Sequence, residues 1–157
     1  MKKFFGFCLV FLLFVAVHGF SQIGSALGLT QNPTIYRCTE LRSGILNSGT
    51  IVPDQSSTVQ SIQIQNTTNG LYVQINYKNG TTESLTLINP ITNRGGNKRN
   101  YDVSYINSQP ASGLFAQVFT GSRGEVIQIE VGRRISTDSY GDLFLIDLVI
   151  SISLQPW

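Results

Sequence analysis

The residues that could catalyse a reaction are carboxylic acids late in the sequence: Glu125, Glu130, Asp138, Asp142 and Asp147. Two carboxyl groups facing each other across a cleft at roughly 5–10 Å can act as acid and base on a glycosidic bond. A secreted hydrolase of carbohydrate is therefore one interpretation. The other, which we favour, places the first, third and fourth of these residues in turns and Glu130 towards solvent.

Asp147 stands out because it lies in the middle of a predicted strand among apolar neighbours. A carboxylate there needs either a cationic partner or access to water. We expect it to pair with a buried arginine, Arg37 or Arg133, or to face solvent near a sheet edge.

A signal peptide is predicted at the start of the chain. Lys2 and Lys3 precede an apolar run, Phe4–Val17, and Val17-His18-Gly19 resembles a cleavage site after Gly19. The run is shorter than the roughly 20 residues that span a bilayer. We therefore expect residues 1–19 to be removed and residues 20–157 to form a single secreted, extracellular domain.

Removal of residues 1–19 excludes several kinds of catalytic and metal site from the secreted part. The only histidine of the chain lies in residues 1–19, so the secreted part lacks a catalytic His base and a Cys/His zinc site. No glycine-rich loop precedes a helix to hold phosphate. The formal charge of +2 also disappears with Lys2 and Lys3, and only 13% of residues are charged, against roughly 25% in average proteins. We expect no cofactor, no metal and no nucleic-acid partner.

The remaining binding candidate is a basic loop between two strands, Arg94-Gly95-Gly96-Asn97-Lys98-Arg99. Arg94, Lys98 and Arg99 could attract an anionic partner such as a sulfated glycan, a lipid head group or an acidic protein surface. A solvated hairpin loop is the simpler interpretation. No aromatic residues lie within the loop for nucleic-acid bases to stack on.

Three residues are candidates for covalent modification. Asn66-Thr67-Thr68 and Asn79-Gly80-Thr81 are N-glycosylation sequons, and both are predicted to lie at turns. Cys38 is the single cysteine after residue 19. It could form an intermolecular disulfide or be a small buried residue of its strand, and the sequence leaves both open.

Short β-branched and aromatic runs, separated by Asn, Gly, Ser and Pro, predict strands throughout the secreted part. In the clearest, Leu71–Tyr77, apolar residues alternate strictly. A three-residue loop ending in a left-handed Gly80 keeps the apolar residues of Leu71–Tyr77 and Thr81–Ile88 on one face. Further strands are expected at the following ranges: Tyr36–Leu41, Val59–Gln65, Tyr101–Ile106, Leu114–Phe119, Val126–Val131 and Leu143–Leu154.

The fold prediction is an all-β, single-domain antiparallel sandwich or barrel of about seven or eight strands. No proline is expected inside a strand. The last strand, Leu143–Leu154, is expected to be central, with one uniformly apolar face, Phe144 to Leu154, packed in the core.

Several blocks of the chain resemble a known family. They are Ala26-Leu27-Gly28, Ile35-Tyr36, Ser61-Ile62-Gln63-Ile64, Thr68-Asn69-Gly70, Leu85-Thr86-Leu87, Asn93-Arg94-Gly95-Gly96 and Asn100-Tyr101-Asp102-Val103. Over residues 26–106 they resemble small secreted insect proteins described as multiprotein bridging factor two-like, or salivary secreted peptides. The chain lacks that family's double glycine before Leu85, and residues 107–157 extend beyond its usual end. The resemblance implies a β-rich secreted protein, and because the family has no established catalytic residues it assigns no site residues to this chain.

These observations favour a secreted, non-enzymatic binding or interaction protein of an extracellular fluid such as saliva or venom. Its partner would be an extracellular protein, a glycan or a lipid surface. Two alternatives stay open: the carboxylate-dependent hydrolase of carbohydrate, and a self-associating or membrane-active protein that forms homo-oligomers through Cys38 or a strand edge.

Overall fold

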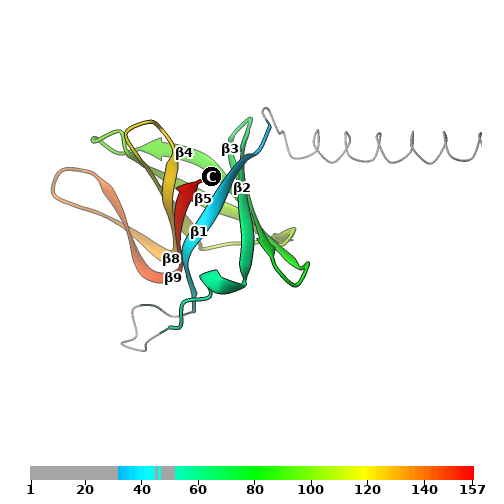
Figure 1. Cartoon of the computed structure of the whole chain (residues 1–157). Helices are drawn as coiled ribbons and strands as arrows, with labels where there is room; N and C mark the ends of the chain where they lie inside the picture. The colour runs from blue at the N-terminus through cyan, green and yellow to red at the C-terminus, as the bar shows by residue number, and fades with distance from the viewer. Residues whose placement is uncertain (1–31, 45, 47–51) are drawn as a thin grey trace, which may run out of the picture.

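Strands fill most of the chain in the computed structural model, which describes residues 32–44, 46 and 52–157 (Figure 1). The predicted signal peptide, residues 1–19, lies outside the described residues. The elements are β1 (Thr34–Ser43), a short 3-10 helix η1 (Ser56–Thr58), β2 (Val59–Thr67), β3 (Gly70–Tyr77), β4 (Thr82–Thr92), β5 (Lys98–Ile106), β6 (Gln109–Pro110), β7 (Phe115–Thr120), β8 (Val126–Thr137) and β9 (Leu143–Pro156).

Eight of these strands close into an antiparallel barrel. Strands β1 to β5 pair in sequence order, β5 pairs with β7, β7 to β9 again pair in order, and β9 pairs with β1. The two-residue β6 lies beside β5. The all-β prediction is confirmed, and of its two architectures the protein has the barrel. Closure leaves no long unpaired strand edge within the described barrel.

The β3–β4 hairpin has the predicted register. Leu71 lies opposite Leu87 and Val73 opposite Leu85. Gly80 has a φ of 85°, a left-handed conformation that glycine adopts without steric cost. The apolar alternation of both strands therefore fills the inside of the barrel.

Pro90 lies inside β4, so the prediction that no proline interrupts a strand is wrong. The pairing of β4 with β5 shifts register between Ile88 and Ile91, and Asn89 between them has a φ of 55°. At such a bulge a residue has no ladder hydrogen bond to make, so proline, which has no N–H, is tolerated.

The prediction for the last strand is also wrong in its first half. Of the apolar face Phe144 to Leu154, only Ile152 and Leu154 are buried, and Phe144 is exposed. The β8–β9 pairing shifts register between Val131 and Gly132, so the alternation breaks there. Beyond this bulge the two strands leave the barrel as a long hairpin, seen in orange in Figure 1.

Three buried amides attach this hairpin to the outside of the barrel. Asn100 and Gln117 lie opposite each other in β5 and β7, on the face away from the core. Gln117 Nε2 and Asn93 Nδ2 donate to the carbonyl oxygen of Leu143 at 2.8 and 2.9 Å. Asn100 links the two amides by its own hydrogen bonds to both. The start of β9 therefore covers the outer face of β5 and β7, which explains how three polar side chains are buried there.

The inside of the barrel differs between its two ends. At one, which we call the closed end, β1 begins and β9 finishes, and buried side chains fill the interior, among them Tyr36, Tyr101, Val126 and Leu154. At the other, the open end, the chain connects β1 to β2, β3 to β4 and β5 to β7. The β8–β9 hairpin departs on this side, and the interior is hollow.

Candidate functional site

A cavity of about 360 Å³ occupies the open end of the barrel. Its lining comes from β1, β3, β4, β5, β8 and β9, so six of the eight barrel strands contribute to it. Pockets of roughly 300–1,000 Å³ are typical of small-molecule sites, and the mouth of a barrel is a usual place for them. An eight-stranded barrel is wide enough either to be filled by side chains or to hold one small ligand.

The deep part of the cavity is apolar. Leu41, Ile75 and Leu85 are buried, and Ile106 and Ile150 are partly buried; all five line it. They come from five different strands and continue the inward-facing rows of the core. This surface suits the body of an apolar ligand.

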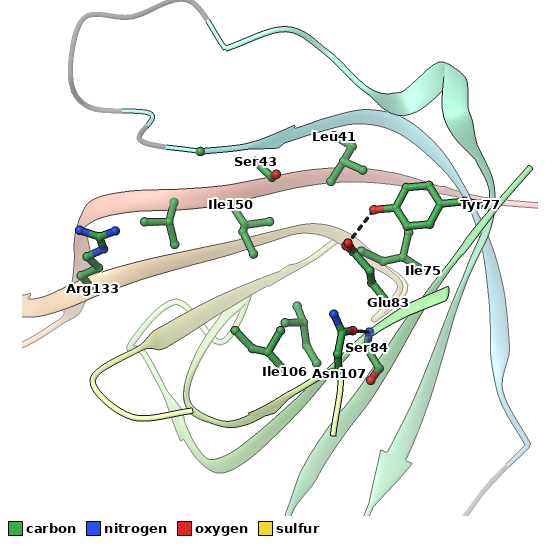
Figure 2. Close-up of a pocket in the computed structure, with 13 residues that line it drawn as sticks. Leu41, Ser43, Ile75, Tyr77, Glu83, Ser84, Ile106, Asn107, Arg133 and Ile150 are labelled. Carbon is green, nitrogen blue, oxygen red and sulfur yellow. Dashed lines mark hydrogen bonds between the residues drawn. The ribbon is translucent and has the colours of Figure 1, made fainter. Parts of the chain in front are cut away.

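Polar groups surround the mouth. The Tyr77 hydroxyl donates to Glu83 Oε2 at 2.9 Å, and the Ser84 N–H donates to Asn107 Oδ1 at 2.7 Å (Figure 2). Burial, together with the Glu83 carboxylate, raises the pKa of Tyr77 far above its ordinary value. Tyr77 is therefore a neutral hydrogen-bond donor at any ordinary pH, and its hydroxyl hydrogen points to Glu83.

Arg133 lines the cavity at the end opposite the Tyr77–Glu83 pair (Figure 2). Within the described residues it has no hydrogen-bond or ion-pair partner. Its neighbour Arg134 does: the Nε atom of Arg134 lies 2.7 Å from Asp147 Oδ2 in an exposed ion pair. Of the two expectations for Asp147, pairing with a buried arginine such as Arg37 or Arg133 is therefore wrong, and the solvent-facing position is confirmed, since 44% of its side chain is exposed. Asp147 has a φ of 55°, close to the register shift that breaks the alternation of β9, and its partner is the next arginine along.

None of the five candidate carboxylates lines the cavity, where Glu83 is the only acid among the described residues. Glu125 and Asp138 accept hydrogen bonds from backbone N–H groups of their own turns. Asp142 accepts one from the N–H of Arg94. Their predicted placement in turns is confirmed.

Glu130 differs from the expectation that it faces solvent freely. It is partly buried on the outer face of β8, next to Gln117 of β7, and accepts a hydrogen bond from Gln128. Burial raises the pKa of its carboxyl, and the charge of Lys98 partly offsets that rise. Glu130 therefore belongs to the outer wall of the barrel. Among the described hydrogen bonds, none joins it to another of the five candidate carboxylates.

The predicted basic loop is shorter than expected. Lys98 and Arg99 belong to β5, because the N–H of Asn93 donates to the carbonyl of Lys98 and closes a tighter turn. Successive residues of a strand point to opposite faces. The charge of Lys98 accordingly acts on the Glu130 carboxyl on the outer wall. Arg99 lies on the inner side, where it partly offsets the rise that burial causes in the pKa of Tyr101. Arg94 stays exposed in the loop, at the closed end.

The two sequons lie at opposite ends of the barrel. Asn79 is exposed in the β3–β4 turn beside the open end, and its Oδ1 accepts hydrogen bonds from the N–H and hydroxyl of Thr81 at 3.0 and 2.7 Å. Asn66 is exposed near the closed end, but within β2 rather than in the turn. Both asparagines are accessible to a modifying enzyme.

Cys38 lies in the wall of the barrel, in β1, and is partly buried. Its thiol donates to the carbonyl of Glu40 at 3.4 Å. Burial and the nearby charge of Asp54 raise the pKa of the thiol from 9.0 to about 11. The thiolate, which is the reactive form, is therefore disfavoured at neutral pH.

Sequence reasoning missed the residues of the cavity. Tyr77 and Glu83 lie six residues apart across the β3–β4 turn, but Arg133 is some fifty residues further along the chain in β8, so no sequence motif joins the three. The available signal was the fold itself, since a barrel of eight strands is one of the few β architectures with room for a ligand.

No family model, curated protein or solved structure matches this chain. In the part of the chain that the structure describes, no helix has the length and apolar character needed to cross a membrane. The same residues contain no group of three or more His, Cys, Asp or Glu that could hold a metal ion.

Proposed function

We propose that this protein is a secreted binding protein that holds a small, largely apolar molecule in the open end of its barrel. The cavity carries the proposal: apolar side chains cover its depth, and a few polar groups surround its mouth. This combination is the usual signature of a ligand site, in which apolar contact supplies affinity and polar groups fix orientation. Secretion into an extracellular fluid rests on the signal peptide predicted at residues 1–19.

Binding is favoured over hydrolysis of carbohydrate because of where the carboxylates lie. Acid–base cleavage of a glycosidic bond needs two carboxyl groups facing one cleft. Among the described residues that line the cavity Glu83 is the only acid, and it already accepts a hydrogen bond from the Tyr77 hydroxyl.

The test begins with the full chain expressed in eukaryotic cells, with the protein collected from the medium. We expect cleavage after Gly19 and added glycan mass at Asn66 or Asn79, measured by mass spectrometry. The fluorescence of the neutral probe N-phenylnaphthylamine should then rise on titration and saturate at one probe per chain. Recovery of the protein only from inside the cells would contradict secretion.

A bulky side chain introduced at the mouth distinguishes binding in the cavity from binding at other surfaces of the protein. Ser43 is an exposed residue of the rim, so the Ser43→Trp variant should fold normally and lose probe binding. Ser122 is equally exposed in the turn at the closed end, and Ser122→Trp should bind the probe like the unmodified protein. If Ser43→Trp binds the probe unchanged, or the unmodified protein shows no saturable binding, the proposed function is wrong.

A further inference from the structure

The cavity has opposite charges at its two ends. Figure 2 shows the guanidinium of Arg133 at one end and the Glu83 carboxylate at the other, with Ile106 and Ile150 between them. The two charged groups differ in their hydrogen-bond partners. Glu83 accepts a hydrogen bond from Tyr77, whereas Arg133 has no partner among the described residues. An arginine beside an apolar surface, without a carboxylate of its own, is a ready receptor for an anion.

The adjacent arginine, Arg134, differs from Arg133 in having a carboxylate partner within the protein. Arg134 follows directly in β8 and pairs with Asp147 at 2.7 Å, on the side away from the cavity. Arg133 lines the cavity, and the described lining offers it no neighbouring anion. Arg133 is exposed at the mouth of the cavity, so solvent partly screens a charge pair there and its effect on affinity is modest.

We propose that the ligand is a small amphipathic monocarboxylate, with its head group on Arg133 and its apolar body over the isoleucines. This inference rests on the proposed function and adds the charge class of the ligand. Glu83 at the far end repels a second anionic group, which restricts the ligand to one negative charge. The cavity equals the space of about a dozen water molecules, at roughly 30 Å³ each. An acid the size of octanoate fits that space.

The test compares octanoate with octanol, which has the same chain and an uncharged head group. Isothermal titration calorimetry at neutral pH should show octanoate binding about tenfold more tightly, the effect of one charge-assisted hydrogen-bonded pair at a partly exposed site. In Arg133→Gln the affinity for octanoate should fall about tenfold to that of octanol, and octanol binding should not change.

Arg134→Gln is the matched control, since it removes the same charge one residue away and outside the cavity. It should leave the octanoate preference intact. If the protein binds octanol and octanoate equally, or if Arg133→Gln keeps the preference, the inference about charge is wrong while the proposed function stands. If Arg134→Gln abolishes the preference as well, the charge acts from the surface and not at the cavity, which also overturns the inference. If no probe binds, the proposed function itself fails.

Discussion

The two ends of the barrel use tyrosine in opposite ways. At the closed end Tyr36 and Tyr101 are buried side chains of the core, and the buried N–H of Val126 donates to the Tyr36 oxygen at 3.2 Å. At the open end Tyr77 is only partly buried and turns its hydroxyl to Glu83 at the rim. Large side chains therefore fill one end, and the other keeps a cavity.

The difference shows that strand number alone does not determine whether a barrel is hollow. Eight strands give an interior that side chains can just fill. What empties the open end is the departure of β8 and β9 at Gly132, where the barrel wall is interrupted. A Cβ atom at this glycine would lie 2.9 Å from the carbonyl oxygen of Ile146 and 3.2 Å from the Cβ of Leu145. Only a glycine lets β8 and β9 approach so closely here. Gly132 therefore allows the β8–β9 hairpin to bend away from the barrel, which leaves the open end hollow.

Two leucines of β4 offer the sharpest test of the comparison. Leu87 and Leu85 are two residues apart on the same inward face, but only Leu85 lines the cavity. Leu87→Ala should lower the free energy of unfolding by about 4 kcal/mol, since it creates a hole in a filled interior. Leu85→Ala should cost about 2 kcal/mol, because a side chain beside a void has already lost contacts on one side. Urea unfolding followed by circular dichroism measures both.

An equal loss for the two leucines, or a larger one for Leu85, would mean that the open end is as tightly packed as the closed end. A cavity-sized ligand gives a second readout with the same variants. It should raise the unfolding midpoint of the unmodified protein and of Leu87→Ala by similar amounts, since the cavity is intact in both.

The amino-acid pattern was sufficient to predict the strands and the β3–β4 register, because one slip would turn Leu71 and Val73 out of the core. It failed where the pairing has bulges. The apolar residues from Phe144 to Leu148 continue the alternation of β9, but the register shift at Gly132 moves them out of the barrel. Hydrophobic periodicity records that a face is apolar and cannot tell which surface covers it.

The site was less predictable than the fold for a related reason. Arg133 and Arg134 are identical in type and adjacent in sequence, yet one lines the cavity and the other pairs with Asp147 outside it. Adjacent residues of a strand point to opposite faces, and which of the two arginines meets the cavity depends on the register shift between Val131 and Gly132, a tertiary property. The candidate carboxylates, in contrast, lie in the turns that their flanking residues indicate.

A smaller effect is expected when single hydroxyl groups are removed from the two ends. Tyr36→Phe leaves the buried N–H of Val126 without its partner, and should cost about 1–2 kcal/mol of stability. Tyr77→Phe removes a hydrogen bond at the rim, where water can replace it, and should cost at most about 0.5 kcal/mol. Urea unfolding of the two variants gives the comparison directly. The reverse order would show that the rim pair, and not the closed end, holds the barrel together.

The smallest effect at neutral pH concerns Cys38, in the wall between the ends, because its thiol is protonated there in both the folded and the unfolded state. Its pKa of about 11 in the folded protein lies above the 9.0 of an unperturbed thiol, because burial and the charge of Asp54 disfavour the thiolate. The folded state therefore holds this proton more tightly than the unfolded state does. The resulting stability is fully present below pH 9 and is lost as the pH rises through 11.

Two measurements follow from this shift. At pH 8 the folded protein should react with iodoacetamide far more slowly than the same protein in urea, because the thiolate fraction falls about a hundredfold for two pKa units. The unfolding midpoint of the unmodified protein should also decline more steeply between pH 9 and 11 than that of Cys38→Ser, which has no thiol to titrate. Rapid labelling of the folded protein would place Cys38 in a reactive state and revive the intermolecular disulfide. Slow labelling, with monomeric elution on size exclusion with and without reductant, would assign Cys38 to the wall of the barrel alone.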